Sequence, residues 1–407
     1  MNSLTVSLGV HSPLTPELRD RILETTRARM EEPAYRLLSP EHLRGLARLE
    51  ARDDPIISVY LCLTPERRAA GGWQSMLSSL AHQTLLKSHE AASETIRRQL
   101  DRIETALNEQ LPELGRSVVF FVCERLGIWR QITLPIALAD RIHVAPRPYI
   151  RPLLRSWGEG DRNLVAVLSQ ERSRFFVDHL GQIEEIYRVK GQRIRGMLTD
   201  RVPRDRRDVL ATQVLKDEAR ALAQMAEIIT RELEPSYLLV AAPPDMHAAF
   251  VESLPKALVE RVQEFAVDIH ASSHAIGEAL GPLREQMRRD QETAVLQELE
   301  EAAFEKVAIG VQETLDCLRE GRVAALVVDD RFAAPGEQCA ECKALFQQAP
   351  GDACPICESG KLQSADDLVD AAAQQALDRG ARVEFIRYPE TQVRLGKFAP
   401  MSALLRY

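Results

Sequence analysis

The sequence lacks the long apolar runs that membrane spans and secretory leaders require. No stretch reaches the roughly 18 consecutive apolar residues that can cross a bilayer. Residues 1–10 contain no basic segment followed by an apolar core. Hydrophobic residues at 45% and charged residues at 28% are globular values. We therefore expect a soluble, cytoplasmic protein that does not bind membranes.

Familiar catalytic signatures are also missing. The sequence contains no nucleophile elbow, no paired-histidine zinc-protease motif and no kinase signature. It contains neither an internal repeat nor a low-complexity segment. The informative features are therefore its cysteine spacing and its local charge.

Length and periodicity predict several domains. A chain of 407 residues exceeds one ordinary hydrophobic core. Buried strand patterns alternate with amphipathic helix patterns throughout, which predicts a mixed α/β (α+β) fold of three tandem domains. A proline-rich run near residue 150 and a charged helix beginning at Pro282 mark the junctions. We place the domains at residues 1–150, 151–281 and 282–407.

The pattern predicts particular elements in the first two domains. Helices are expected over Thr15–Glu32, Asp208–Leu233 and Met246–Leu258. Strands are expected over Ile56–Cys62 and Phe265–Ile269.

In the third domain we expect parallel strands over Ala324–Asp329 and Val383–Ile386. Between them, Ser364 is predicted to cap a helix with acidic residues in its first turn.

Seven cysteines are present, and four of them form two Cys-x2-Cys pairs separated by eleven residues. Two such knuckles can place four thiolates around one metal ion, which predicts a zinc ribbon inserted at residues 336–361. Four sulfur ligands leave no open position, so the Zn²⁺ is expected to be structural. An iron–sulfur cluster and two chance pairs are the alternatives. The expected metal ligands are Cys339, Cys342, Cys354 and Cys357.

Charge is unevenly distributed along the chain. The net charge is −8, yet residues 188–207 contain eight basic residues and two acidic ones, a local charge of +6 that leaves −14 elsewhere. Arginine-rich segments suit RNA phosphates, because guanidinium groups bind them bidentately. A solvated charged loop is the alternative interpretation. The candidate RNA-binding residues in the predicted loop 188–208 are Arg188, Lys190, Arg193, Arg195, Arg201, Arg204, Arg206 and Arg207.

The C-terminal third resembles the last domain of the archaeo-eukaryotic release factors and their relative pelota. The resemblance rests on residues 309–315 (IGVQETL), 319–326 (REGRVAAL) and the ending 398–407 (FAPMSALLRY). A zinc-binding insertion at the same place occurs in archaeal members. In that family the first domain reads the decoding centre, the second reaches the peptidyl-transferase centre and the third docks a translational GTPase.

Two motifs of the family are absent. True release factors carry Gly-Gly-Gln before the long helix of the second domain, whereas the nearest match here is Lys190-Gly191-Gln192. The codon-reading motif Asn-Ile-Lys-Ser is matched only in its last two residues, at Lys87-Ser88. The resemblance therefore points to the bacterial branch of the superfamily, which includes the hibernation factor Balon.

This resemblance implies a non-catalytic factor that occupies the A site of vacant or stalled ribosomes. Its expected partners are ribosomal 23S and 16S RNA and elongation factor Tu or another translational GTPase. The enzymatic alternative is a release or rescue factor that hydrolyses peptidyl-tRNA with Gln192. A tRNA or RNA nuclease is a third possibility. We find no acidic pair or histidine in the sequence that is positioned for that cleavage chemistry.

Overall fold

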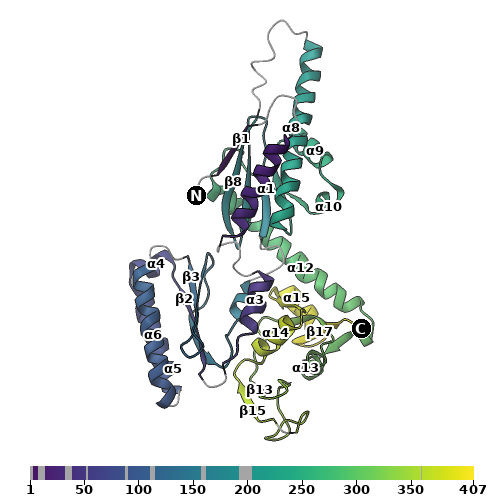
Figure 1. Cartoon of the computed structure of the whole chain (residues 1–407). Helices are drawn as coiled ribbons and strands as arrows, with labels where there is room; N and C mark the ends of the chain where they lie inside the picture. The colour runs from purple at the N-terminus through teal and green to yellow at the C-terminus, as the bar shows by residue number, and fades with distance from the viewer. Residues whose placement is uncertain are drawn as a thin grey trace. The chain divides into compact units, whose positions relative to one another are not determined.

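The computed structural model describes nine stretches of the chain, and the side chains of residues 204–208 lie outside that description. Two compact units divide it: residues 1–36 with 159–288 form unit 1, and residues 37–158 with 289–407 form unit 2. Each unit contains at least one mixed or antiparallel sheet covered by helices, as Figure 1 shows. The mixed α/β fold class is therefore confirmed. The described residues are 3–7, 14–32, 39–51, 54–87, 90–110, 115–156, 162–191, 204–358 and 360–407.

Unit 1 is built on a six-stranded sheet of order β1-β8-β7-β6-β9-β10. The middle strands β6, β7 and β8 form an antiparallel meander, while β9 and β10 continue the sheet in parallel from β6. The strands are β1 (Leu4–Ser7), β6 (Arg162–Val167), β7 (Arg172–His179), β8 (Gln182–Lys190), β9 (Leu238–Ala241) and β10 (Val262–Glu264).

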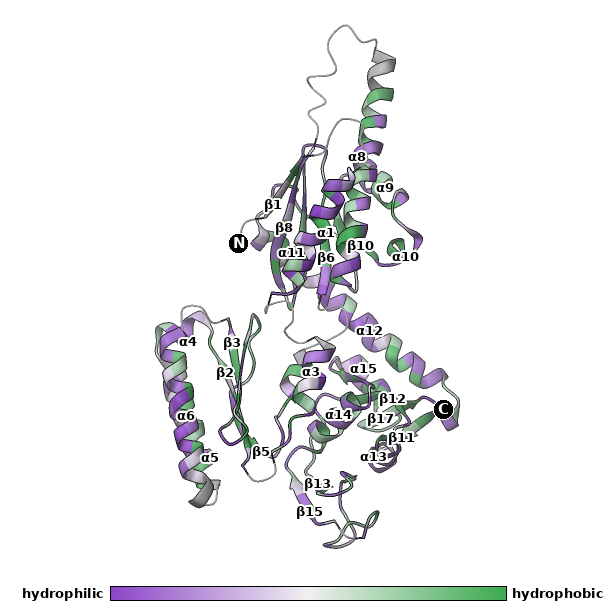
Figure 2. Cartoon of the chain, viewed as in Figure 1, coloured by the Kyte–Doolittle hydropathy of each residue, from purple (hydrophilic) through white to green (hydrophobic). Residues whose placement is uncertain are grey.

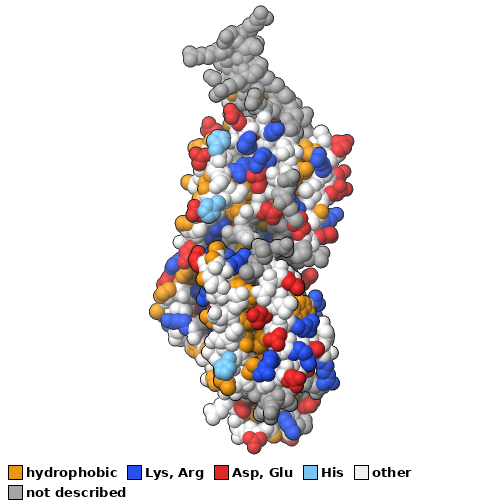
Figure 3. Space-filling model, turned by 90° about the vertical axis from the view of Figure 1, so that its left-hand side faces the viewer, with side chains coloured by type: hydrophobic (Ala, Val, Ile, Leu, Met, Phe, Trp, Pro, Cys, Tyr) orange, Lys and Arg blue, Asp and Glu red, His pale blue; other side chains and the backbone are white. Residues whose placement is uncertain are grey.

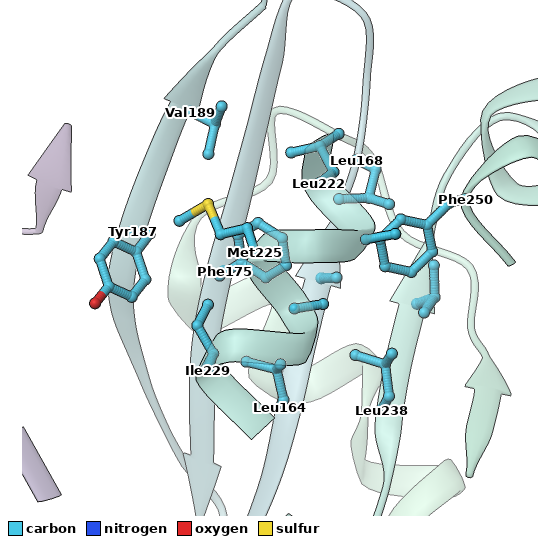
Figure 4. Close-up of a cluster of buried hydrophobic side chains, with 14 of the residues drawn as sticks. Leu164, Leu168, Phe175, Tyr187, Val189, Leu222, Met225, Ile229, Leu238 and Phe250 are labelled. Atoms are coloured by element: carbon cyan, nitrogen blue, oxygen red, sulfur yellow. The ribbon is translucent and has the colours of Figure 1, made fainter. Parts of the chain in front are cut away.

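Helices cover both faces of this sheet. Helices α1 (Pro16–Met30), α8 (Arg204–Leu233) and α9 (Pro244–Glu252) pack on one face, where the side chains in Figure 4 form the core. Phe175, Leu222 and Met225 are fully buried there. The opposite face is covered by α11 (Ser273–Ala279) and the start of α12 (Gly281–Glu301), while α10 (Lys256–Val259) follows α9.

The first 36 residues are grouped with a later part of the chain and not with residues 37–158. They belong to unit 1, although the sequence placed them in a domain spanning residues 1–150. Strand β1 pairs in parallel with β8, and the side chains of Arg27 and Glu232 join α1 to α8 at 2.9 Å. Strand β1 has only four residues and pairs with a strand about 180 positions away. The local sequence therefore does not indicate which sheet it joins.

Unit 2 begins with an antiparallel sheet of order β4-β3-β2-β5. Helices α5 (Gly72–Lys87) and α6 (Glu90–Gln110) bury one face of this sheet around Trp73 and Phe120. Figure 2 shows the apolar side of these helices in green. The strands and shorter helices are α3 (Pro40–Ala47), β2 (Ile56–Cys62), α4 (Pro65–Ala69), β3 (Ser117–Cys123), β4 (Ile128–Leu134), β5 (Arg141–Ala145) and α7 (Arg151–Ser156).

The rest of unit 2 contains a second four-stranded sheet, β11-β17-β12-β16, and a small three-stranded ribbon, β14-β13-β15. Strands β12 and β16 are parallel, as the sequence predicts. The elements are η3 (Phe304–Lys306), β11 (Val307–Ile309), α13 (Val311–Glu320), β12 (Val323–Asp329), β13 (Gly336–Cys339), β14 (Leu345–Phe346), β15 (Leu362–Ala365), α14 (Leu368–Asp378), β16 (Arg382–Ile386), α15 (Pro389–Leu395) and β17 (Met401–Leu405).

Three local predictions differ from the structure. The segment Phe265–Ile269 has the alternating burial of a strand, but β10 ends at Glu264. The Phe265 N–H still donates to the Val240 carbonyl at 3.0 Å, and Phe265, Val267 and Ile269 pack on the core. The predicted helix Met246–Leu258 is split because Pro255 cannot continue α9. Ser364 lies in β15, and Asp367 caps α14 by accepting from the N–H groups of residues 369 and 370.

No helix in the described ranges is both long enough and apolar enough to cross a membrane.

Candidate functional site

The four paired cysteines come together in the ribbon of unit 2. Their sulfur atoms all lie within 4.8 Å of one another, with Cys339 and Cys357 separated by 3.6 Å and Cys342 and Cys354 by 3.5 Å. Sulfur atoms placed tetrahedrally about 2.3 Å from one zinc ion are roughly 3.7 Å apart. The cluster therefore has the dimensions of a site that could hold a metal ion.

The surrounding backbone supports sulfur ligation. The N–H of Cys342 donates to Cys339 Sγ, and the N–H of Ile356 donates to Cys354 Sγ, each at 3.4 Å. A Cβ atom at Gly360 would lie 2.2 Å from Cys339 Sγ, so only glycine lets the chain pass this close to the cluster. These donors favour negatively charged sulfur, as a thiolate–metal site requires.

The cluster is also sensitive to protonation. Burial raises the pKa of Cys342 to about 12, and the neighbouring thiols act in the same direction. A bound dication reverses this preference, because metal ligation requires thiolates. Metal binding should therefore release protons and weaken in acid.

The structure describes only the two ends of the predicted basic loop. Arg188 and Lys190 belong to β8, and Arg188 Nε lies 2.7 Å from a carboxylate oxygen of Glu185. At the other end the backbone of residues 204–208 already forms the first turns of α8. The predicted loop 188–208 is thus too long at both ends. Gln192 lies outside the described residues. Six candidate RNA-binding residues also lie outside them or have undescribed side chains: Arg193, Arg195, Arg201, Arg204, Arg206 and Arg207.

Helix α8 extends beyond the sheet at its N-terminal end (Figure 1). Val209 and Leu210 are exposed there by 70% and 44%, and Val214 is the first buried residue of the helix among those described. The first residues of α8 whose side chains are described, 209–213, therefore do not pack into the core. The face in Figure 3 carries basic and acidic side chains interspersed.

A buried carboxyl group lies where the basic segment leaves the sheet. The N–H of Gly191 donates to the carbonyl of Glu171 at 3.0 Å. A Cβ atom at Gly191 would lie 1.9 Å from the Gln170 carbonyl oxygen and 2.4 Å from Glu218 Oε1, so Gly191 permits this close approach.

Glu218 comes from α8 and is only 5% exposed, and its Oε2 has no hydrogen-bond partner among the described residues. Burial raises the pKa of Glu218 to about 7. Sequence reasoning missed this residue, although the spacing Val214, Glu218, Leu222 places it on the buried stripe of α8.

Comparison with known families identifies this part of the chain. Residues 148–303 match the model of bacterial archaeo-eukaryotic release factor family 10. Over these residues the chain is similar to the bacterial archaeo-eukaryotic release factors. The matched residues include β6 to β10, the whole basic segment and α8. This confirms the resemblance inferred from the C-terminal third, and it does so on a different part of the chain.

Solved structures of archaeal factors are similar to this chain at low sequence identity. Archaeal translation termination factor aRF1 is 16% identical, with 91% of this chain and 99% of that chain covered and a TM-score of 0.23. Pelota from Archaeoglobus fulgidus is 16% identical, with 72% and 79% covered and a TM-score of 0.32. An archaeal Pelota from a ribosome-bound model with ABCE1 is 16% identical, with 72% and 77% covered and a TM-score of 0.39. No curated protein sequence matches the chain.

Proposed function

We propose that this chain is a ribosome-binding translation factor that occupies the A site of vacant or stalled ribosomes without reading a codon or catalysing hydrolysis. The match of residues 148–303 to a release-factor family carries the proposal. The basic segment lies within that match. A release-factor body without Gly-Gly-Gln or the codon-reading motif retains the means to bind but lacks the residues that the known factors use for termination.

Under this proposal the basic segment contacts 23S RNA, and the N-terminal part of unit 2 faces 16S RNA. Arginine side chains on the projecting end of α8 would neutralise phosphates and release counterions. The C-terminal part of unit 2 would lie near elongation factor Tu or another translational GTPase.

We further propose that the cysteine cluster holds one structural Zn²⁺ ion. Four thiolates favour zinc among the common divalent metals and fill its tetrahedral shell. The ion would cross-link the two knuckles and so stabilise a ribbon that buries only a few side chains of its own.

Peptidyl-tRNA hydrolysis by Gln192 is the alternative, and a release assay separates the two. Purified protein added to stalled ribosomes with labelled peptidyl-tRNA should release no peptide above the background, while it blocks delivery of aminoacyl-tRNA to the A site. Release that disappears in Gln192→Ala but persists in the exposed control Gln182→Ala would contradict the non-catalytic proposal.

A further inference from the structure

Lys343 connects the cysteine cluster to two other parts of unit 2. It directly follows Cys342, and its backbone has a φ of +62°, a conformation that non-glycine residues seldom adopt. Its N–H donates to the carbonyl of Cys339 at 3.1 Å, which closes the first knuckle. The backbone of Lys343 is therefore an integral part of the knuckle that carries two of the four sulfur atoms.

The side chain of Lys343 reaches the N-terminal lobe of unit 2, which we define as residues 39–156. Its Nζ lies 2.5 Å from Glu50 Oε1, and the other carboxylate oxygen of Glu50 accepts from Arg147 at 2.9 Å. The side chains of Lys343, Glu50 and Arg147 are exposed by only 29%, 23% and 23%. Partial burial limits screening by solvent, so this network contributes more than an exposed ion pair does.

The carbonyl of Lys343 is held separately by the C-terminal lobe, residues 289–407. It accepts a hydrogen bond from the side-chain amide of Gln375, which is 93% buried on α14. One residue thus joins the knuckle, α14 and the N-terminal lobe.

A second row of contacts joins the same two lobes without using the knuckle. Asp370 on α14 accepts from the backbone N–H groups of Ile150 and Arg151 at 2.9 and 2.7 Å. Asp367 pairs with the Arg151 guanidinium at 3.0 Å, and Gln374 donates to the carbonyl of Pro148 at 2.8 Å. The two rows border a cavity of about 280 Å³. The N–H groups of Ile150 and Arg151 therefore report directly on whether the lobes remain joined.

We propose that the metal centre is a clamp that fixes Lys343 and thereby holds the N-terminal lobe against the C-terminal lobe. The left-handed backbone at Lys343 is costly, and the knuckle that imposes it depends on ligated sulfur. When the metal leaves, the knuckle relaxes and Lys343 loses its position between Glu50 and Gln375. Metal occupancy thus sets how readily the two lobes separate. The proposal needs only a metal at the four sulfurs and not the ribosomal role.

Hydrogen exchange on the full-length protein tests this coupling, with metal content measured in parallel. Lys343→Ala should keep one metal per chain yet speed exchange at Ile150 and Arg151 roughly five- to thirtyfold, the range expected when one or two interactions are lost. Chelation of the wild-type protein should produce the same change at these two amides. Chelated Lys343→Ala should exchange there no faster than either alone. Lys361→Ala, an exposed lysine of the same ribbon, is the matched control and should leave exchange unchanged.

Two results would overturn the clamp. If chelation loosens the ribbon while Ile150 and Arg151 keep their wild-type exchange, the metal is not coupled to the lobes. Wild-type exchange rates at Ile150 and Arg151 in metal-loaded Lys343→Ala would show that Lys343 does not hold the two lobes together. Because Lys343→Ala leaves all four ligands in place, it remains informative even if chelation unfolds the ribbon.

Discussion

At the scale of single residues, Glu218 of unit 1 is a buried carboxyl group whose pKa is raised. It places a carboxyl group inside the packed face between α8 and the sheet, near the carbonyl oxygen of Gln170. An ionised carboxylate is unfavourable away from water, whereas the protonated form carries no charge and loses less on burial. This explains why the pKa of Glu218 is raised to about 7.

Glu218→Gln should therefore change how stability depends on pH. The folded-state pKa lies above the value of about 4.3 for an unfolded carboxyl group. The contribution that the protonated carboxyl group makes to the free energy of unfolding is therefore fully present below about pH 4.3. It is lost as pH rises to about 7, with a slope of at most about 1.4 kcal/mol per pH unit. Urea unfolding from pH 5 to 8.5 should show Glu218→Gln gaining stability over wild type as pH rises. A constant difference between the two proteins would refute this.

At the scale of elements, the projecting end of α8 allows the proposed RNA binding to be tested separately from folding. Residues 209–213, the first of α8 with described side chains, lie outside the core, so we expect that replacing the arginines just before them leaves the free energy of unfolding nearly unchanged. If those arginines bind phosphates, the triple substitution Arg204→Ala, Arg206→Ala and Arg207→Ala should weaken ribosome binding. It should also reduce the slope of log K against log salt by about 0.7–0.9 per lost contact.

The control for this triple variant removes the same charge from the same unit. Arg27, Arg220 and Arg231 are exposed residues of unit 1, and each is partnered by a nearby carboxylate. Their replacement by alanine should leave the salt slope at the wild-type value. Equal slopes for both triple variants would show that the projecting end of α8 makes no phosphate contact.

The elements also show how far sequence reasoning reaches. Continuous apolar runs such as Ile56–Cys62 identify their strands to the residue, because a strand buried on both faces carries its signal locally. The Cys-x2-Cys spacing likewise predicts the cluster. Strand β1 could not be placed, since its pairing with β8 depends on residues far along the chain. Lys343 and Glu50, 293 positions apart, give no local sign of their contact.

At the scale of the whole molecule, the family match and the metal ribbon lie in different units. Residues 148–303 carry the match to the release-factor family, mostly in unit 1, while the four cysteines cluster in the C-terminal part of unit 2. Binding and structural stiffening can therefore be disturbed independently. Substitutions in α8 should spare metal content, and substitutions in the ribbon should spare the core of unit 1.

Co-sedimentation with purified ribosomes tests the central claim most directly. The metal-loaded, folded protein should pellet with vacant ribosomes at low ionic strength, and its binding constant should fall linearly with salt on logarithmic axes. Elongating ribosomes with an occupied A site should retain much less of it. Failure of the folded protein to pellet with any ribosome at low ionic strength would contradict the account.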